Sequence, residues 1–122
     1  MKLRKRKELN YIFNPPVSVP QLILYQRIKQ YYKTAELNYP IETHAGKIRW
    51  ADVAIFGNGL NKEHYLIDVE YDGYLAHKYK RKQDRERDLE LKRVGWATVR
   101  INKKTINNVF GLIEEAINAS SS

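Results

Sequence analysis

The chain contains no cysteine among its 122 residues. This absence excludes disulfide bonds and thiolate-bound zinc, and it indicates a reducing compartment. No apolar run approaches the length of a membrane span, and the N-terminal sequence Met1-Lys2-Leu3-Arg4-Lys5-Arg6-Lys7 lacks the hydrophobic block of a signal peptide. We therefore expect a cytoplasmic protein without a membrane partner.

Acidic residues are the minority charge, since 14 Asp and Glu stand against 22 Lys and Arg, for a net charge of +8. This excess predicts a polyanionic partner, with nucleic acid preferred to an acidic membrane surface. The cations that we expect to contact nucleic-acid phosphates gather in two places, the N-terminal arm and the segment after the third predicted strand. They are Lys5, Arg6, Lys78, Lys80, Arg81, Lys82, Arg85 and Arg87.

The length suits one domain with a real hydrophobic core. Residues 1–17 read as a basic arm that ends in the helix-breaking run Asn14-Pro15-Pro16, residues 18–119 as a single domain, and residues 120–122 as a tail.

Ser18-Val19-Pro20-Gln21 predicts the start of a helix, with an apolar stripe that includes Leu22, Ile28 and Tyr31. Alternation and turn residues predict strands over 37–42, 48–56, 64–71 and 96–101, with Gly57-Asn58-Gly59 as a hairpin signal. Helices are predicted over about 79–94 and 104–118. The expected fold is mixed α/β, a central mixed four-stranded sheet flanked by helices. The step from the third strand through a helix to the fourth permits a parallel right-handed crossover.

Acidic residues collect at the exit of the third predicted strand, in Asp68-Val69-Glu70-Tyr71-Asp72. In an extended segment Asp68, Glu70 and Asp72 share one face. The second predicted strand carries one acid, Asp52, and antiparallel pairing would bring it towards Glu70. Because neighbouring carboxylates repel one another, the arrangement favours a bound hard cation.

Phosphodiester hydrolysis needs a cation, a base and a group that orients the base. Mg²⁺, or Mn²⁺, binds through one or two carboxylates plus waters, so Asp52 and Glu70 suffice as its anchor. His77 follows the acidic strand and titrates near neutrality, which suits a general base. Asp84 is placed to hold its imidazole in one tautomer.

Simpler explanations exist for several of these residues. Asp72-Gly73 is typical of a turn, and His44 and His64 of surface positions. The charged run from Lys78 to Arg93 is, on composition, a solvated helix face.

The order Asp52, then Glu70-Tyr71-Asp72-Gly73-Tyr74-Leu75-Ala76-His77, then Asp84-Arg85-Glu86-Arg87-Asp88 leading through Leu91 to Gly95-Trp96, resembles the PD-(D/E)XK nucleases. The most similar branch is the very-short-patch-repair-like one, with phage-type homing endonucleases of the E-D-x-H-D pattern. The resemblance implies a restriction-endonuclease-like fold and a Mg²⁺-dependent DNA endonuclease in a bacterial or phage-infected cell. It makes Asp52, Glu70 and the main-chain carbonyl of Tyr71 the metal ligands, and His77 the base with Asp84 as its partner. Asp72 then stands where many relatives have lysine.

Two departures from the pattern matter. Gln21 occupies a helix position where the branch usually has a glutamate that orders metal-bound water, and a neutral amide cannot act as a carboxylate. The repair members also bind a structural zinc through cysteine and histidine, which this chain cannot do. The lack of cysteine favours a homing or mobile-element nuclease over a repair nickase.

Two other functions fit the same sequence. One is a catalytically silent DNA-binding module with a nuclease fold, and the other is a nuclease subunit of a transposition or restriction complex. A homodimer is compatible with each, and the sequence does not decide the oligomeric state.

Overall fold

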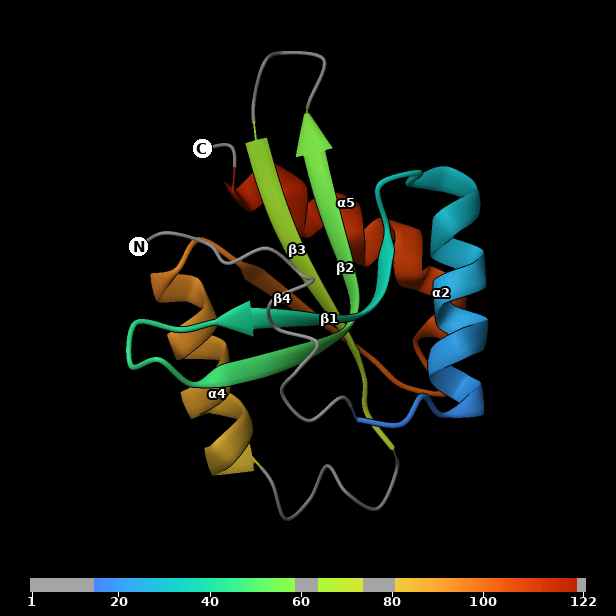
Figure 1. Cartoon of the computed structure of the whole chain (residues 1–122). Coiled ribbons are helices and arrows are strands. Elements are labelled where there is room, and N and C mark those ends of the chain that lie inside the picture. The colour runs from blue at the N-terminus through green and yellow to red at the C-terminus, as the bar shows by residue number, and fades with distance from the viewer. Residues whose placement is uncertain (1–14, 59–63, 74–80, 121–122) are drawn as a thin grey trace.

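The structure, a computed structural model, describes residues 15–58, 64–73 and 81–120. It contains one four-stranded sheet with helices on both faces (Figure 1). The elements in chain order are α2 (Val19–Tyr31), β1 (Glu36–Glu42), β2 (Ile48–Asn58), β3 (His64–Tyr71), α4 (Arg81–Arg93), β4 (Ala97–Ile101), the 3₁₀ helix η1 (Ile106–Asn108) and α5 (Val109–Ser120). The predicted mixed sheet with flanking helices is confirmed.

The strands lie in the order in which they occur in the chain, β1-β2-β3-β4. β1, β2 and β3 are antiparallel neighbours, and Val53 pairs with Val69. β4 pairs with β3 in parallel, with Val69 opposite Val99. The parallel step, which α4 precedes along the chain, is therefore confirmed.

The sheet separates two hydrophobic clusters. α2 and α5 cover one face with residues such as Leu24, Ile28 and Ile113, which pack on Ile67 and Val69. On the other face Leu91 of α4 packs with Trp96, Ile41, Ala51 and Ala54. Asp68 and Glu70 alternate with Ile67 and Val69 along β3, so their side chains lie on the α4 face.

α2 begins where the sequence predicts, because the Ser18 side chain accepts a hydrogen bond from the N–H of Gln21 at 3.2 Å. Its buried stripe differs from the prediction. Gln21, Leu24 and Ile28 are buried, whereas Leu22 and Tyr31 are 40% and 76% exposed. The predicted stripe was wrong at those two positions, because polar Gln21 takes an inward place that hydrophobicity alone assigns to an aliphatic residue.

α4 runs from Arg81 to Arg93 and ends before Gly95, whose φ of +93° suits glycine. Its inner face carries Asp84, Arg87, Asp88 and Leu91, as the sequence predicts. The expected start near Tyr79 lies outside the described residues.

The final helix starts later than predicted. The Asn102 side chain accepts hydrogen bonds from the N–H groups of Lys104 and Thr105, at 2.8 and 3.0 Å. This local turn competes with helix, so α5 begins only at Val109, after η1. No helix in the described part of the chain is long and apolar enough to cross a bilayer.

Candidate metal centre

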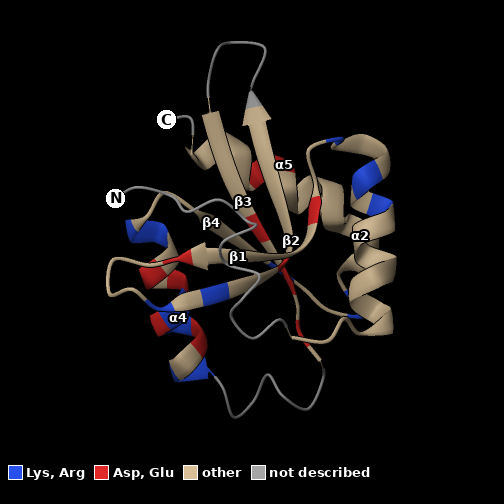
Figure 2. Ribbon diagram, viewed as in Figure 1, with Lys and Arg blue, Asp and Glu red and all other residues tan. Residues whose placement is uncertain are grey.

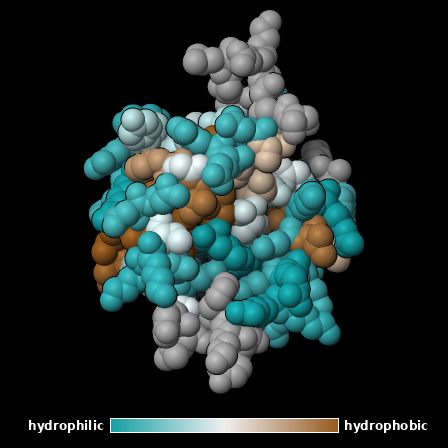
Figure 3. Space-filling view, turned by 180° about the vertical axis from the view of Figure 1, so that it is seen from behind, coloured by the Kyte–Doolittle hydropathy of each residue, from teal (hydrophilic) through white to brown (hydrophobic). Residues whose placement is uncertain are grey.

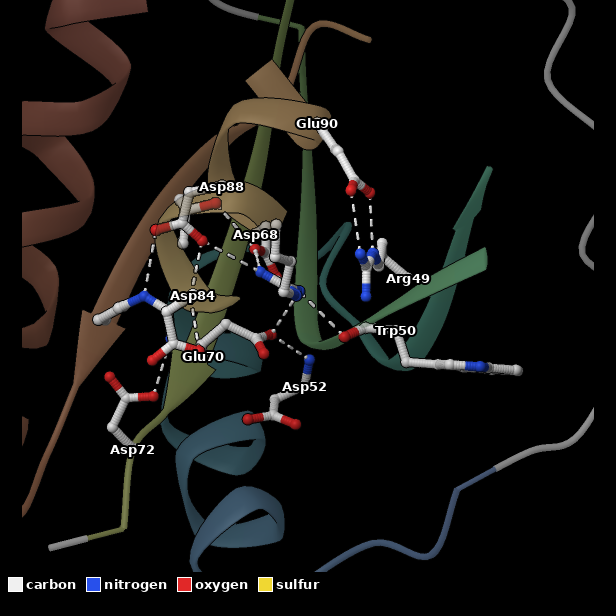
Figure 4. Close-up of polar contacts among 12 residues, drawn as sticks. Arg49, Trp50, Asp52, Asp68, Glu70, Asp72, Asp84, Asp88 and Glu90 are labelled. Carbon is white, nitrogen blue, oxygen red and sulfur yellow. Dashed lines mark hydrogen bonds and ion pairs between the residues drawn. The ribbon is translucent and has the colours of Figure 1, made fainter. Parts of the chain in front are cut away.

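The carboxylates of Asp52 and Glu70 lie where the backbone pairing between β2 and β3 ends. We call this place the fork. The backbone ladder runs from Asn58 opposite His64 to Val53 opposite Val69, and beyond it side chains take the place of backbone partners. The main-chain N–H of Asp52 donates to Oε2 of Glu70 at 2.8 Å (Figure 4). The N–H of Tyr71 donates to Oδ2 of Asp52 at 2.8 Å. The predicted approach of Asp52 to Glu70 is confirmed.

An irregularity in β1 and β2 coincides with this fork. Leu37 pairs with Val53 and Tyr39 with Ala51, while Asn38 between them has a φ of +53°. Ala51 and Ala54 both pack in the α4-side cluster although strict alternation would separate them. The alternation of β2 is therefore interrupted at the position that carries Asp52, which turns its carboxylate towards the β3 backbone.

Burial raises the pKa values of both carboxyl groups. The pKa of Glu70 lies well above its ordinary value because of burial and the charge of Asp68, and Arg87 opposes this rise. Burial also raises the pKa of Asp52, against the hydrogen bond from Tyr71. Two partly buried carboxylates with a third beside them therefore carry an unfavourable charge that a cation would relieve.

Arg87 of α4 supplies one positive charge to this group. Its guanidinium donates to both oxygens of Asp68, at 2.7 and 3.2 Å, and to the main-chain carbonyl of Trp50 at 3.1 Å. It also lies 3.3 Å from Oε2 of Glu70. The Asp68 side chain has no exposed surface and accepts a further bond from the Thr98 hydroxyl at 2.9 Å. This arrangement differs from the phosphate contact that the sequence suggested for Arg87, because its donors are engaged inside the protein.

Gln21 reaches the same fork from α2. It is 5% exposed, and its Nε2 donates to the main-chain carbonyl of Asp52 at 3.2 Å. Gln21 therefore lies beside Asp52 and contributes a neutral amide that binds the main chain.

A second ionic group surrounds Arg100 of β4. Its guanidinium contacts Asp72 at 2.9 Å, Asp88 at 2.7 Å and Asp84 at 3.7 Å. Asp72, predicted to stand where relatives have lysine, thus binds a cation from the neighbouring strand. Asp84 lies on the inner face of α4 with Arg100 as a partner.

The remaining predicted site residues divide into two groups. Arg81, Lys82 and Arg85 are exposed on α4. His77, Lys5, Arg6, Lys78 and Lys80 lie outside the described residues.

Sequence reasoning missed the internal roles of Asp68, Arg87 and Arg100. A signal was present for Arg87, because it shares a helix face with Leu91, the one buried residue of α4. A charge on a buried stripe requires a buried partner. Asp68, two residues before Glu70 on the same strand face, was the available candidate.

The donor set at the fork fits a hard divalent cation. No cluster of three or more His, Cys, Asp or Glu side chains placed to hold a metal occurs in residues 15–58, 64–73 and 81–120. Mg²⁺, however, takes one or two carboxylates and keeps several waters. Asp52 and Glu70 supply two carboxylates for such a site.

Comparisons with protein families, curated proteins and solved structures found no match to this chain. The geometry of the fork, with Asp52 and Glu70 on adjacent strands, is therefore the main basis for assigning a function.

Proposed function

We propose that the protein is a Mg²⁺- or Mn²⁺-dependent DNA endonuclease with a restriction-endonuclease-like fold, of the homing or mobile-element type. One observation carries the proposal. Asp52 and Glu70 each have one carboxylate oxygen bound by a main-chain N–H of the other strand segment, at 2.8 Å in both cases. Both carboxylates are thereby held at one fork, where a cation would neutralise their charge.

In this proposal Asp52, Glu70 and the Tyr71 carbonyl hold the cation. When bound, the ion would supply neutralisation of the charge that develops on the scissile phosphate. Arg87 orients Glu70 through Oε2, and Gln21 fixes the main chain at Asp52. His77 is the proposed general base, with Asp84 as its proposed partner.

The proposed DNA contacts come from cations of α4 and from others that the sequence supplies. Arg81, Lys82 and Arg85 are exposed on α4, whose ribbon carries the blue of Lys and Arg in several places (Figure 2). Lys5, Arg6, Lys78 and Lys80 complete the proposed set from the sequence. Arg87 is left out because its guanidinium is engaged by Asp68. Double-stranded DNA is the proposed partner, and two copies would allow both strands to be cut.

A specific observation favours a second candidate, a catalytically silent DNA-binding module. Gln21 is neutral and its Nε2 is bound to backbone, so the carboxylate that usually orders water near Asp52 is missing. A third candidate, a subunit of a transposition or restriction complex, would need a partner for activity.

Incubation of the full chain with supercoiled plasmid and Mg²⁺ or Mn²⁺, with EDTA controls, tests the proposal. Asp52→Asn is the informative variant, because its amide oxygen still accepts the Tyr71 N–H while the charge is lost. Glu90→Gln is the matched control, since Glu90 pairs with Arg49 on the α4 surface.

The endonuclease is supported if metal-dependent nicking or cutting disappears in Asp52→Asn and persists in Glu90→Gln. Mn²⁺ titration should accompany cleavage, because a narrow target preference would hide activity on a plasmid. DNA binding that falls with salt, ignores Mg²⁺ and survives Asp52→Asn would identify the silent module instead. Cleavage that appears only with a partner protein would identify the subunit.

A further inference from the structure

β4 forms an edge of the sheet. It is the last strand in the order β1-β2-β3-β4, and in the described residues no strand pairs with its outer side. The Asp72 N–H donates to the Ile101 carbonyl at 2.8 Å, so Ile101, Val99 and Ala97 direct their backbone groups towards β3. Thr98 and Arg100 therefore carry N–H and C=O groups on the open edge.

Two adjoining hollows follow this edge. The larger, about 770 Å³, lies between α4 and α5 along Gly95–Thr98. The smaller, about 350 Å³, continues along Thr98–Arg100. Both are lined by Thr98 and Ala116, so they form one groove, which we call the β4 groove. At about 3.3 Å per residue, its four β4 positions, Ala97–Arg100, span roughly 13 Å.

Several of the residues that line the groove are small. Gly95 and Ala97 come from the strand side, and Ala116 and Ala119 from α5. The face seen from behind shows hydrophobic patches among hydrophilic side chains (Figure 3). An added main chain therefore has room between the two helices.

The two walls differ in charge. On the α4 wall Arg85 and Lys92 are exposed, and Asp88 is bound by Arg100. On the α5 wall the lining residues are Leu112, Ala116, Ala119 and Ser120, with Glu115 as the one charged group among the α5 residues that line the two hollows.

We propose that the β4 groove binds an extended segment of a partner protein as a fifth strand, with acidic side chains towards α4 and aliphatic side chains towards α5. Main-chain hydrogen bonds to Thr98 and Arg100 would supply affinity, and alternate side chains would supply specificity. An acidic side chain directed to the α5 wall would meet the like charge of Glu115. The acidic positions of the bound segment must therefore be those that point towards α4.

A second copy of this chain fits the groove less well. A two-fold axis normal to the sheet would place each α4 beside the α4 of the other copy. The walls that carry Arg85 and Lys92 would then face each other, and like charges at close range disfavour that pairing.

The test uses the full chain and two labelled, end-capped octapeptides, one repeating Val-Glu and one repeating Val-Lys. Fluorescence anisotropy at low salt should show binding of the Val-Glu peptide and at least about tenfold weaker binding of the Val-Lys peptide. Lys92→Glu should reduce the difference in affinity between the Val-Glu and Val-Lys peptides. Ala116→Phe should fill the groove and abolish binding, while Ala45→Phe, in an exposed turn, should leave binding unchanged.

Ala119→Phe provides a second groove-filling variant at an exposed position if Ala116→Phe does not fold. Equal binding of the two peptides, no binding of either, or binding that survives both groove-filling variants would overturn the proposal. Loss of duplex DNA binding in the groove-filling variants, with no peptide bound, would overturn it in favour of a nucleic-acid groove. The measurement needs neither metal nor DNA cleavage, so its failure leaves the endonuclease proposal standing.

Discussion

Arg87 holds the carboxylate of Asp68 through two hydrogen bonds, at 2.7 and 3.2 Å, in a place where the Asp68 side chain has no exposed surface. The pair joins β3 to α4 directly beside Glu70. Burial alone would lower the pKa of Arg87, but the charges of Asp68 and Glu70 raise it, so the guanidinium stays charged. The pair therefore supports both the fold and the orientation of the candidate metal ligand.

Arg87→Met is expected to lower the free energy of unfolding by about 3–5 kcal/mol, because it leaves the Asp68 carboxylate buried without its partner. Urea denaturation measures the loss. Arg49→Met is the control, since the Arg49 and Glu90 side chains are 29% and 24% exposed and such pairs contribute roughly 1 kcal/mol or less. Equal costs for the two variants would contradict the internal role of Arg87.

Gln21→Glu is expected to place a third carboxylate beside Asp52. In EDTA this should cost about 1–3 kcal/mol, because the bond to the Asp52 carbonyl is lost and a buried charge is added. Mn²⁺ should restore stability and raise cleavage. Thermal melts with and without metal measure the effect, with exposed Gln30→Glu on the same helix as the control. A metal response no larger than that of the control would count against a cation at the fork.

The stability of the metal-free protein should depend on Glu70 in a defined direction. An unfolded glutamate ionises near 4.5, while the folded-state pKa of Glu70 is well above that value because of burial. Between these two pKa values the folded state binds more protons, so stability decreases as pH rises through that window and stays reduced above it.

Glu70→Gln removes the ionisable group and, with it, this pH-dependent contribution to stability. The variant keeps an oxygen that accepts the Asp52 N–H. Relative to the natural chain, the variant should therefore gain stability as pH rises from about 4.5. Urea denaturation of both proteins in EDTA across this range measures the difference. A difference that stays constant with pH would show that Glu70 does not titrate as the structure indicates.

His77→Gln tests the proposed general base. Loss of such a base typically lowers a rate by roughly 10²–10⁴-fold, whereas the fold and Mn²⁺ binding should persist. Single-turnover cleavage and Mn²⁺ titration separate these effects. Unchanged cleavage in this variant would remove His77 from the proposed mechanism.

Gly57 of β2 faces Tyr65 of β3 in the antiparallel ladder, and a methyl group at Gly57 would overlap the tyrosine ring. Gly57→Ala should cost roughly 1–3 kcal/mol through this overlap. The same change in a Tyr65→Ala background should cost clearly less. Denaturation of the four proteins in a double-mutant cycle measures the coupling, and additive costs would show that the ring moves aside freely.

Much of the fold follows from local sequence signals. The alternation in β3 and the Ser18 cap predicted their elements closely, because each signal lies within a few residues of the structure it forms. The buried stripe of α2 was mispredicted because Gln21 has its partner 31 positions away, at Asp52. The internal ion pairs of Arg87 and Arg100 likewise join distant segments, and local patterns do not determine which charges meet.

The parallel pairing of β4 with β3 affects the order in which the protein assembles. β1, β2 and β3 are consecutive along the chain and antiparallel, so each can pair with the next after only a short loop has closed. β4 joins only when the chain from Tyr71 to Ala97 has closed on itself, and pairings of that separation form slowly. Because Asp68 meets Arg87 and Thr98 only after that closure, we expect the ionic and hydrogen-bond contacts of Asp68 to form late in folding, after the three-stranded meander that carries Asp52 and Glu70.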